Sequence, residues 1–179
     1  KPRSLQLAEQ LSRERGDSYG RAWVAFAQGV AFANAGLLKP ASLQIAQAEE
    51  LFRNQSQPST AEVRMCRQIS AWLSMMLGNF DELARSELWM REAEERGDRI
   101  GAQRLRCIAV FAALVGDDPG KAQERLRQVQ VGEDDRFDVL MLLESSARVQ
   151  VRLYTSDADA CLDGLPELDA IFNSPILAM

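Results

Sequence analysis

The sequence contains no histidine among its 179 residues. Histidine is the base in Cys-His and Ser-His-Asp catalytic groups and a leading ligand of zinc and iron. Its absence therefore excludes these active sites, and most such metal sites, within this chain. Aromatic residues make up only 7% of the chain, and β-branched residues are few beside Ala, Leu, Arg, Glu and Gln. That composition favours helix over strand.

The chain also has no excess of basic residues, since its net charge is -5. Nucleic-acid-binding domains carry a basic footprint, so we expect no nucleic-acid partner. No apolar run reaches the roughly 18 residues that a membrane-spanning helix needs, and no signal peptide opens the chain. We therefore expect a cytoplasmic protein without a membrane partner. With 46% apolar and 26% charged residues, the composition is that of an ordinary folded domain.

Recognisable sites for catalysis or cofactors are missing as well. The chain has no glycine-rich phosphate loop with its lysine and no kinase catalytic loop. Cys66, Cys107 and Cys161 are odd in number and share no close spacing. We expect them to be buried free thiols in a reducing compartment, with a disulfide or a reactive thiol as the alternative. The sequence thus predicts no enzyme activity, no metal and no cofactor in this region.

What the sequence does contain is a repeated break between helix-patterned runs. Arg15-Gly16-Asp17 is followed three residues later by Gly20, and Arg96-Gly97-Asp98 is followed three residues later by Gly101. Glycine adopts the left-handed conformation that ends a helix, and aspartate caps the first amide groups of the next one. Each Gly-Asp pair is therefore predicted to end one helix and start another.

A second set of glycines ends apolar runs at a regular interval. Gly36, Gly78 and Gly116 are 42 and 38 residues apart, within the range of roughly 33 to 47 residues typical of helical-hairpin arrays. We predict helices over residues 2–15, 18–35, 40–55, 60–77, 80–96, 99–115, 119–130, 136–154 and, as a last short pair, 157–172. The predicted fold class is all-α, a TPR-like array of antiparallel helix hairpins, or α-solenoid, of about four pairs. Residues 1–179 would form a single TPR-like helical-repeat domain, and we expect it to be a fragment of a longer multidomain protein.

Apolar residues alternate between richer and poorer helices. The helices over 18–35, 60–77, 99–115 and 136–154 are the richer ones, and we expect them to be sandwiched between their neighbours and to line the concave surface of the array. The poorer helices are expected to lie outside. On this pattern Ile100 and Val115 are predicted to be buried, and so are Phe80 and Leu88.

Two resemblances support the repeat interpretation. Phe32, Ala35 and Gly36, followed by Ala48 and Phe52, stand at the aromatic and small positions of a repeat, and this unit resembles a tetratricopeptide repeat. A longer succession covers nearly the whole chain: Gly16-Asp17 with Gly20, Gly29, Gly36, Ala48 to Arg53, Leu77-Gly78, Arg96-Gly97-Asp98, Gly116 to Pro119 with Ala122, and Leu153-Tyr154. In this order it resembles the helical region C-terminal to the kinase and ATPase domains of large bacterial serine/threonine protein kinases. Ala61-Glu62 departs from the tryptophan-glutamate pair usual there. The resemblance implies a non-catalytic sensor or scaffold segment of a signalling protein, with the kinase domain outside this region.

The charges are segregated between the two sets of helices. The four apolar-rich helices hold nine arginines and three acids, a net of +6, whereas the alternate helices hold ten bases and sixteen acids, a net of -6. Arginine suits the bidentate capture of carboxylate or phosphate. One interpretation is an inner surface that binds an acidic peptide or a phosphorylated segment; the other is that these arginines pair with acids of neighbouring helices. The candidate partner-binding residues are Arg64, Arg67, Gln68, Arg104, Arg106, Arg148 and Arg152.

The sequence therefore favours a protein-interaction or regulatory scaffold module of a bacterial kinase, binding another protein or another domain of the same chain. A small-effector-sensing domain is the alternative, with the effector near Tyr19, Trp23 and Phe26. An apolar pocket with a few inward polar groups would favour that alternative. A third possibility is a structural spacer or oligomerisation segment.

Overall fold

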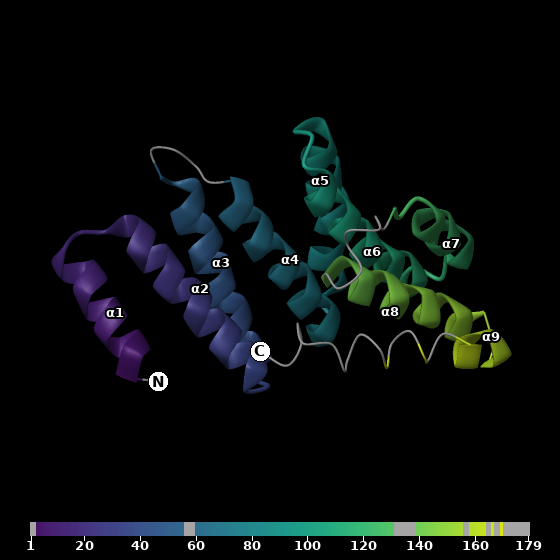
Figure 1. Cartoon of the computed structure of the whole chain (residues 1–179), viewed down its shortest axis with the longest axis horizontal. Helices are drawn as coiled ribbons and strands as arrows, with labels where there is room; N and C mark the ends of the chain where they lie inside the picture. Colours follow the sequence, from purple (N-terminus) through teal and green to yellow (C-terminus); the bar gives the residue numbers. More distant parts are fainter. Residues whose placement is uncertain are drawn as a thin grey trace. The chain divides into compact units, whose positions relative to one another are not determined.

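The structure, a computed structural model, describes residues 3–55, 60–130, 139–155 and 158–163, together with positions 166 and 169. Every regular element within these ranges is a helix, which confirms the predicted all-α class and is consistent with an α-solenoid (Figure 1). The chain divides into two compact units, Lys1–Asn79 and Phe80–Met179. Each is described by itself, and a single TPR-like domain stays a prediction.

The helix boundaries follow the predicted breaks closely. The first unit contains α1 (Arg3–Glu14), α2 (Ser18–Asn34), α3 (Leu38–Arg53) and α4 (Thr60–Leu77). The second contains α5 (Phe80–Glu95), α6 (Arg99–Val115), α7 (Pro119–Arg127), α8 (Val139–Tyr154) and α9 (Ala158–Asp163). The predicted start of a helix at 136 lies outside the described residues.

The Gly-Asp breaks work as the sequence predicts. Gly16 has a φ of 64° and Gly97 a φ of 72°, the left-handed conformation that ends α1 and α5. The aspartate that follows each glycine caps the next helix. The Asp17 carboxylate accepts a hydrogen bond from the Gly20 amide at 2.8 Å, and Asp98 accepts one from Gly101 at 3.0 Å. In each break the glycine thus ends one helix and the aspartate that follows it starts the next.

At the end of α6 the left-handed conformation falls on an aspartate rather than on the glycine. Gly116 has a φ of -78° and is the C-cap itself, whereas Asp117 takes the positive φ of 57°. The Asp117 and Asp118 amides donate to the Leu114 and Ala113 carbonyls, each at 3.0 Å. This is the hydrogen-bond pattern of the other turns moved one residue along the chain. Aspartate is among the residues that tolerate this conformation, and α6 ends at Val115, the predicted end.

The core of the first unit is built from small residues around buried aliphatic and aromatic side chains. α2 lies between α1 and α3 in the ribbon (Figure 1). Ala22 and Ala25 of α2 pack with Ile45 and Phe52 of α3, and Val63, Cys66 and Leu73 of α4 complete the cluster. Gly29 permits the close approach of α2 to α3, because a Cβ at this position would lie 2.7 Å from two side-chain carbons of Ile45.

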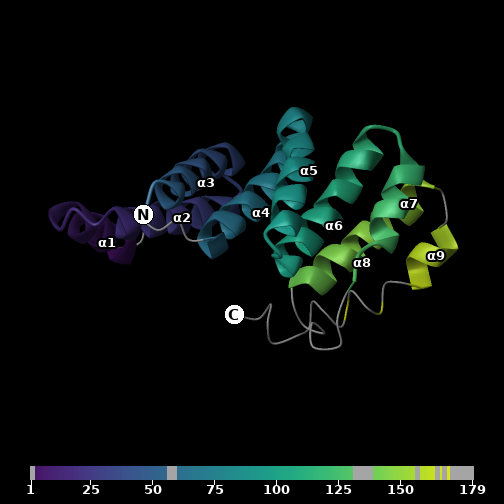
Figure 2. The same ribbon diagram turned by 90° about the horizontal axis from the view of Figure 1, so that it is seen from above.

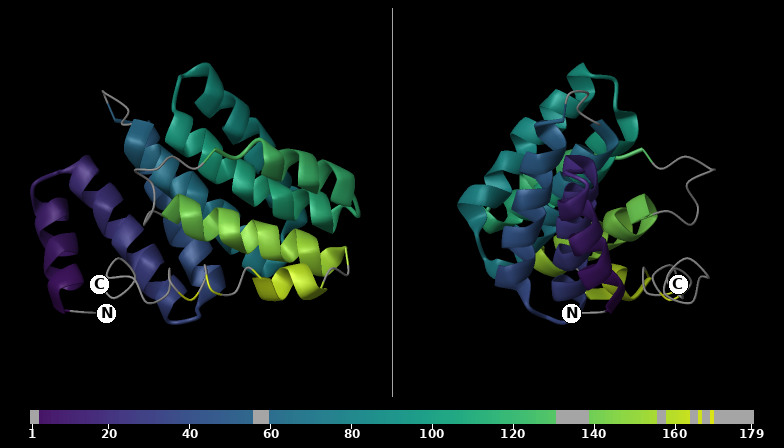
Figure 3. Two further views of the ribbon diagram at one scale, coloured as in Figure 1. Left: turned by 45° about the vertical axis from the view of Figure 1, so that its right-hand side comes forward. Right: turned by 90° about the vertical axis from the view of Figure 1, so that its left-hand side faces the viewer.

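The core of the second unit is centred on α6. This helix buries a continuous run of residues from Cys107 to Val110, and Val110 packs with Ala113, Ala122 of α7 and Ala147 of α8. Figures 2 and 3 show α5, α7 and α8 beside α6 within this unit. Burial on several sides of α6 explains why the second half of this helix, from Cys107 to Val115, is entirely apolar.

Some residues predicted to be buried are half exposed. Phe80 and Leu88 of α5 are each 50% exposed, Ile100 is 48% exposed and Val115 is 45% exposed. The spacing of apolar residues along one helix predicts which face is apolar, but it does not show how far the neighbouring helix covers that face. Ile100 is the second residue of α6 and Val115 is its last, so both lie at the ends of the helix.

Candidate functional site

The seven predicted binding residues come from three helices in two units. Arg64, Arg67 and Gln68 lie on α4 of the first unit. The second unit carries the other four on α6 and α8, namely Arg104, Arg106, Arg148 and Arg152. That the two sets share one concave surface stays a prediction, and each set is described within its own unit.

In the first unit, Arg67 is paired inside the protein. Its Nε donates to Glu49 Oε1 of α3 at 3.2 Å, and the two side chains are only 12% and 16% exposed. A pair this well covered is screened less than a surface pair, so it joins α4 to α3. Arg67 thus agrees with the second interpretation of the arginines, in which they pair with acids of neighbouring helices.

Arg64, Gln68 and Trp72 follow one another at four-residue spacing and therefore form a ridge along α4. Arg64 and Gln68 are partly buried and have interactions within the chain. Trp72 is 37% exposed, and Met76, one turn further on, is 53% exposed. We call these four residues the α4 ridge. It combines a guanidinium group, an amide and two large apolar side chains along one line.

The first half of α4 is also tied to α2. The Tyr19 hydroxyl donates to Glu62 Oε1 at 2.6 Å. Burial, with the nearby charges of Glu49 and Glu62, raises the pKa of the Cys66 thiol to about 12. The thiolate is the reactive form of cysteine, so Cys66 is inert at neutral pH, as expected of a buried free thiol.

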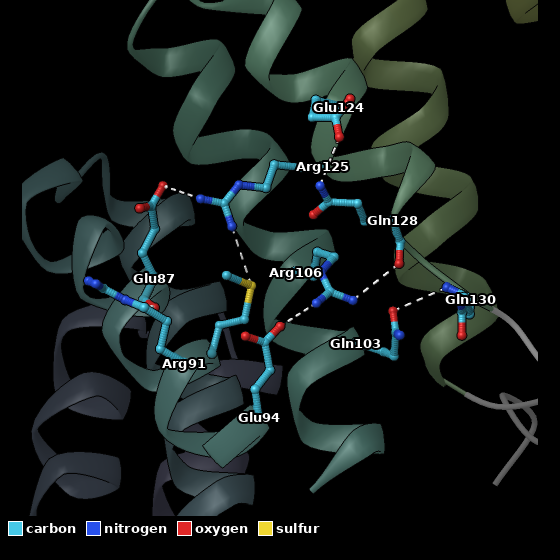
Figure 4. Close-up of polar contacts among 10 residues, drawn as sticks. Glu87, Arg91, Glu94, Gln103, Arg106, Glu124, Arg125, Gln128 and Gln130 are labelled. Carbon is cyan, nitrogen blue, oxygen red and sulfur yellow. Dashed lines mark hydrogen bonds and ion pairs between the residues drawn. The ribbon is translucent and has the colours of Figure 1, made fainter. Parts of the chain in front are cut away.

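In the second unit, Arg106 links three helices. Its Nη2 is paired with Glu94 of α5, and its Nη1 donates to the Gln128 carbonyl, at the C-cap of α7, at 3.1 Å (Figure 4). Beside it, the Gln103 side chain accepts a hydrogen bond from the Gln130 amide at 3.1 Å. A guanidinium group at a helix C-terminus satisfies a carbonyl that has no partner within its helix. Arg106 therefore holds α7 in place, and its side chain is only 14% exposed.

A second charged cluster joins α5 to α7, and the sequence analysis missed it. Glu87 lies 3.0 Å from Lys121 Nζ and 3.1 Å from Arg125 Nη2. Arg125 also donates to the sulfur of Met90 at 3.5 Å (Figure 4). Burial raises the pKa of Glu87, but the hydrogen bond from Lys121 and the charges of Arg125, Lys121 and Arg91 outweigh it, so the pKa is lowered. The sequence signal was the acid-rich α5 followed by a basic α7.

On α8 the predicted arginines also have interactions within the chain. Arg148 pairs with Glu144 one turn earlier on the same helix. Arg152 lies in the last turn of α8, and Arg104 lies on α6; both have interactions of their own. Burial and the charge of Glu144 raise the pKa of the Cys107 thiol to about 12 against the opposing effect of Arg106. The Cys107 thiol is therefore protonated and unreactive at neutral pH.

The predicted aromatic cluster is present and includes one further ring. Phe52 is fully buried, with its centroid 5.7 Å from that of Tyr19 and 5.4 Å from that of Trp23. Trp23 also lines an open groove of about 400 Å³ between α1 and α2, with Leu5 and Leu11 among its apolar walls. Arg15, Asp17 and Ser12 supply its polar lining. The groove thus has the mixed lining that would suit a small effector.

Among the described residues, no group of three or more acidic or cysteine side chains is arranged to hold a metal ion. Within the same part of the chain, no helix has both the length and the apolar character needed to cross a membrane. Comparisons of this chain with protein-family models, curated proteins and solved structures found no match.

Proposed function

We propose that this chain is a non-catalytic, TPR-like module that binds a protein partner through the α4 ridge. The observation that carries the proposal is Trp72, a large aromatic side chain that is 37% exposed beside Met76, Gln68 and Arg64. Tryptophan and arginine are the residue types that most often dominate binding energy in protein interfaces, whereas a monomer usually covers such residues. The ridge therefore suits a partner with an apolar anchor flanked by an acidic or phosphorylated residue.

The arginines of the second unit have a different role in this proposal. Arg106 and Arg148 already pair with Glu94 and Glu144. Since these pairs lie within the unit, a partner that used them would have to displace a carboxylate of the chain. Partner recognition is accordingly assigned to the α4 ridge, and Arg106 is assigned to the fold.

The wider context comes from the sequence resemblance alone. On that basis the module belongs to a large bacterial serine/threonine protein kinase, is cytoplasmic, and passes partner binding to a catalytic domain outside this region. The buried free thiols of Cys66, Cys107 and Cys161 suit a reducing compartment. Purified protein is expected to hydrolyse no ATP.

The experiment compares a ridge variant with a matched control. Immobilised wild-type protein captures partners from a lysate of its own source, and the affinity of each captured protein is then measured for Trp72→Ala and for Leu43→Ala. Leu43 is a control in the same unit because it is also apolar and is 72% exposed on α3. Trp72→Ala is expected to weaken binding at least about tenfold. If the captured partner bound the wild type and both variants with equal affinity, the α4 ridge would not be part of the interface.

The groove beside Trp23 favours one second candidate, an effector-sensing domain. Its apolar walls with a few polar groups are the usual composition of a small-molecule site. A thermal-shift screen of apolar metabolites distinguishes the two functions, because Trp23→Ala should abolish such a shift while Trp72→Ala leaves it unchanged.

A further inference from the structure

A second cavity in the first unit is polar rather than apolar. It has a volume of about 320 Å³ and is lined by α1, α2 and α3. Water occupies roughly 30 Å³ per molecule in the liquid, so the cavity has room for a ligand as large as about ten waters. We call it the polar cleft. It is distinct from the groove beside Trp23, whose lining includes no residue of α3.

Each helix lines the polar cleft with one face. α2 contributes Arg21 and Gln28 at a spacing of seven residues, and α3 contributes Gln44 and Gln47 at a spacing of three. Such spacings place side chains on the same side of a helix. The floor between them consists of buried Val24 and Ala25 and similar small residues. The polar groups therefore surround a covered floor, with Gln28 buried beside it and Arg21 and Gln47 exposed at the rim.

One carboxylate in the polar cleft is already neutralised. Glu9 of α1 is paired with Arg13 at 2.5 Å and accepts a hydrogen bond from Gln28 Nε2 at 3.3 Å. The Gln28 side chain is 8% exposed, and within the described chain it makes no other hydrogen bond. An amide has two donor hydrogens and one acceptor oxygen. Gln28 therefore keeps one donor and its acceptor for a bound molecule.

Arg21 supplies the uncompensated charge. Its side chain makes no hydrogen bond or ion pair with any residue that the structure describes, and the same holds for the side chains of Gln44 and Gln47. Two guanidinium groups and one carboxylate leave the polar cleft with one positive charge. A site with this charge and several amides complements a monoanion that also offers hydroxyl or amide groups.

We propose that the polar cleft binds a small polar monocarboxylate, such as a sugar acid or an acylated amino acid. Arg21 binds the carboxylate through its guanidinium fork, and Gln28, Gln44 and Gln47 hydrogen-bond the neutral polar groups of the ligand. A phosphate dianion fits less well, because only one positive charge is uncompensated. The site is separate from the α4 ridge, so it does not depend on the proposed protein partner.

The test follows the side-chain amide and backbone resonances of the whole chain by two-dimensional NMR during titration with four probes. D-gluconate and N-acetylglutamine are the monocarboxylates. Sorbitol is the neutral counterpart of gluconate, and inorganic phosphate, used at a pH above its second pKa, tests the dianion. The two carboxylates are expected to shift the Gln28, Gln44 and Gln47 side-chain resonances in a saturable way, and at least one of them should bind about tenfold more tightly than sorbitol or phosphate.

Two arginine variants provide the matched control. Arg21→Gln is expected to weaken carboxylate binding by about tenfold or more, which is the effect of losing one charge-assisted contact. Arg53→Gln should leave it unchanged, since Arg53 lies on α3 of the same unit, is exposed and does not line the polar cleft. The proposal is overturned if neither carboxylate binds saturably, if phosphate binds as tightly, or if the two variants behave alike. Backbone spectra of both variants establish that they are folded.

Discussion

The two units use the same helix breaks but different contacts to hold their helices together. In the first unit, fully buried Phe52 packs edge-on against Tyr19 and Trp23. In the second unit, α6 buries apolar residues, and Arg106 pairs with Glu94 of α5. Glu87 with Lys121 and Arg125, here called the Glu87 cluster, joins α5 to α7. The Gly-Asp signature therefore determines where helices end. The contacts between neighbouring helices depend on other residues and differ between the two units.

The largest expected effect is the loss of the buried ring in the first unit. Phe52→Ala should lower the free energy of unfolding by about 3 to 5 kcal/mol, because it leaves a cavity and removes two aromatic contacts. Chemical denaturation followed by circular dichroism measures the change. Leu43→Ala, on an exposed part of the same helix, should change it by less than about 0.5 kcal/mol. If the two substitutions lowered the free energy of unfolding by similar amounts, the aromatic core would be contradicted.

The next prediction removes a charged contact from the second unit. Arg106→Met should cost about 1.5 to 3 kcal/mol, since it leaves the Gln128 carbonyl and Glu94 without their charged donor. Arg127→Met should cost less than about 0.5 kcal/mol, because its pair with Glu124 is exposed on both sides and lies on one helix. Denaturation of both variants tests the difference. If Arg106→Met were as mild as Arg127→Met, Arg106 would be available for a partner after all.

A third pair of variants tests whether the two units share equivalent turns. Gly16→Val and Gly97→Val should each destabilise the protein by about 1 to 2 kcal/mol, because both glycines have positive φ. No neighbour lies within 4 Å of a Cβ at either position, so the cost is conformational. Gly120→Ala, in a helix with ordinary φ, should be neutral or mildly stabilising. Unequal costs in the thermal unfolding of the two valine variants would show that the turns are not equivalent.

The smallest expected effect is the pH dependence of the Glu87 cluster. The pKa of Glu87 is lowered in the folded state from its ordinary value of 4.5. Its stabilising contribution is therefore complete above about pH 4.5 and is lost as the pH falls through the folded-state pKa. The difference in unfolding free energy between the wild type and Glu87→Gln should shrink over that window, and it should stay below about 1 kcal/mol because the cluster is partly exposed. A difference in unfolding free energy that grows as the pH falls would contradict a lowered pKa of Glu87.

Most of the fold was predictable because its signals are local. Gly16, Gly97 and the aspartates that follow them determine helix ends through their own backbone and side-chain chemistry. The residue that adopts positive φ after α6 was not predictable in the same way, since Gly116 and Asp117 can each take that conformation. The exposure of Ile100 and Phe80 was also misjudged, because burial depends on where a neighbouring helix lies.

Less of the candidate site was predictable, because its contacts join distant residues. The segregation of arginines was visible in the sequence, yet the pairing of Arg106 with Glu94 and the Gln128 carbonyl depends on how three helices meet. The polar cleft gave no sequence signal at all. Glu9, Arg21 and Gln44 each resemble solvent-facing residues of an amphipathic helix, and only the packing of α1, α2 and α3 brings them together.

The close approach at Gly29 has a mechanical consequence for the polar cleft. With no side chain on Gly29, α2 and α3 approach closely, and this helix pair forms two of the three walls of the cleft. α1 forms the third wall and is joined to them through the turn at Gly16 and the 3.3 Å contact between Gln28 and Glu9. The width of the cleft is therefore expected to depend on the position of α1, and the distance between spin labels on α1 and α3 measures it.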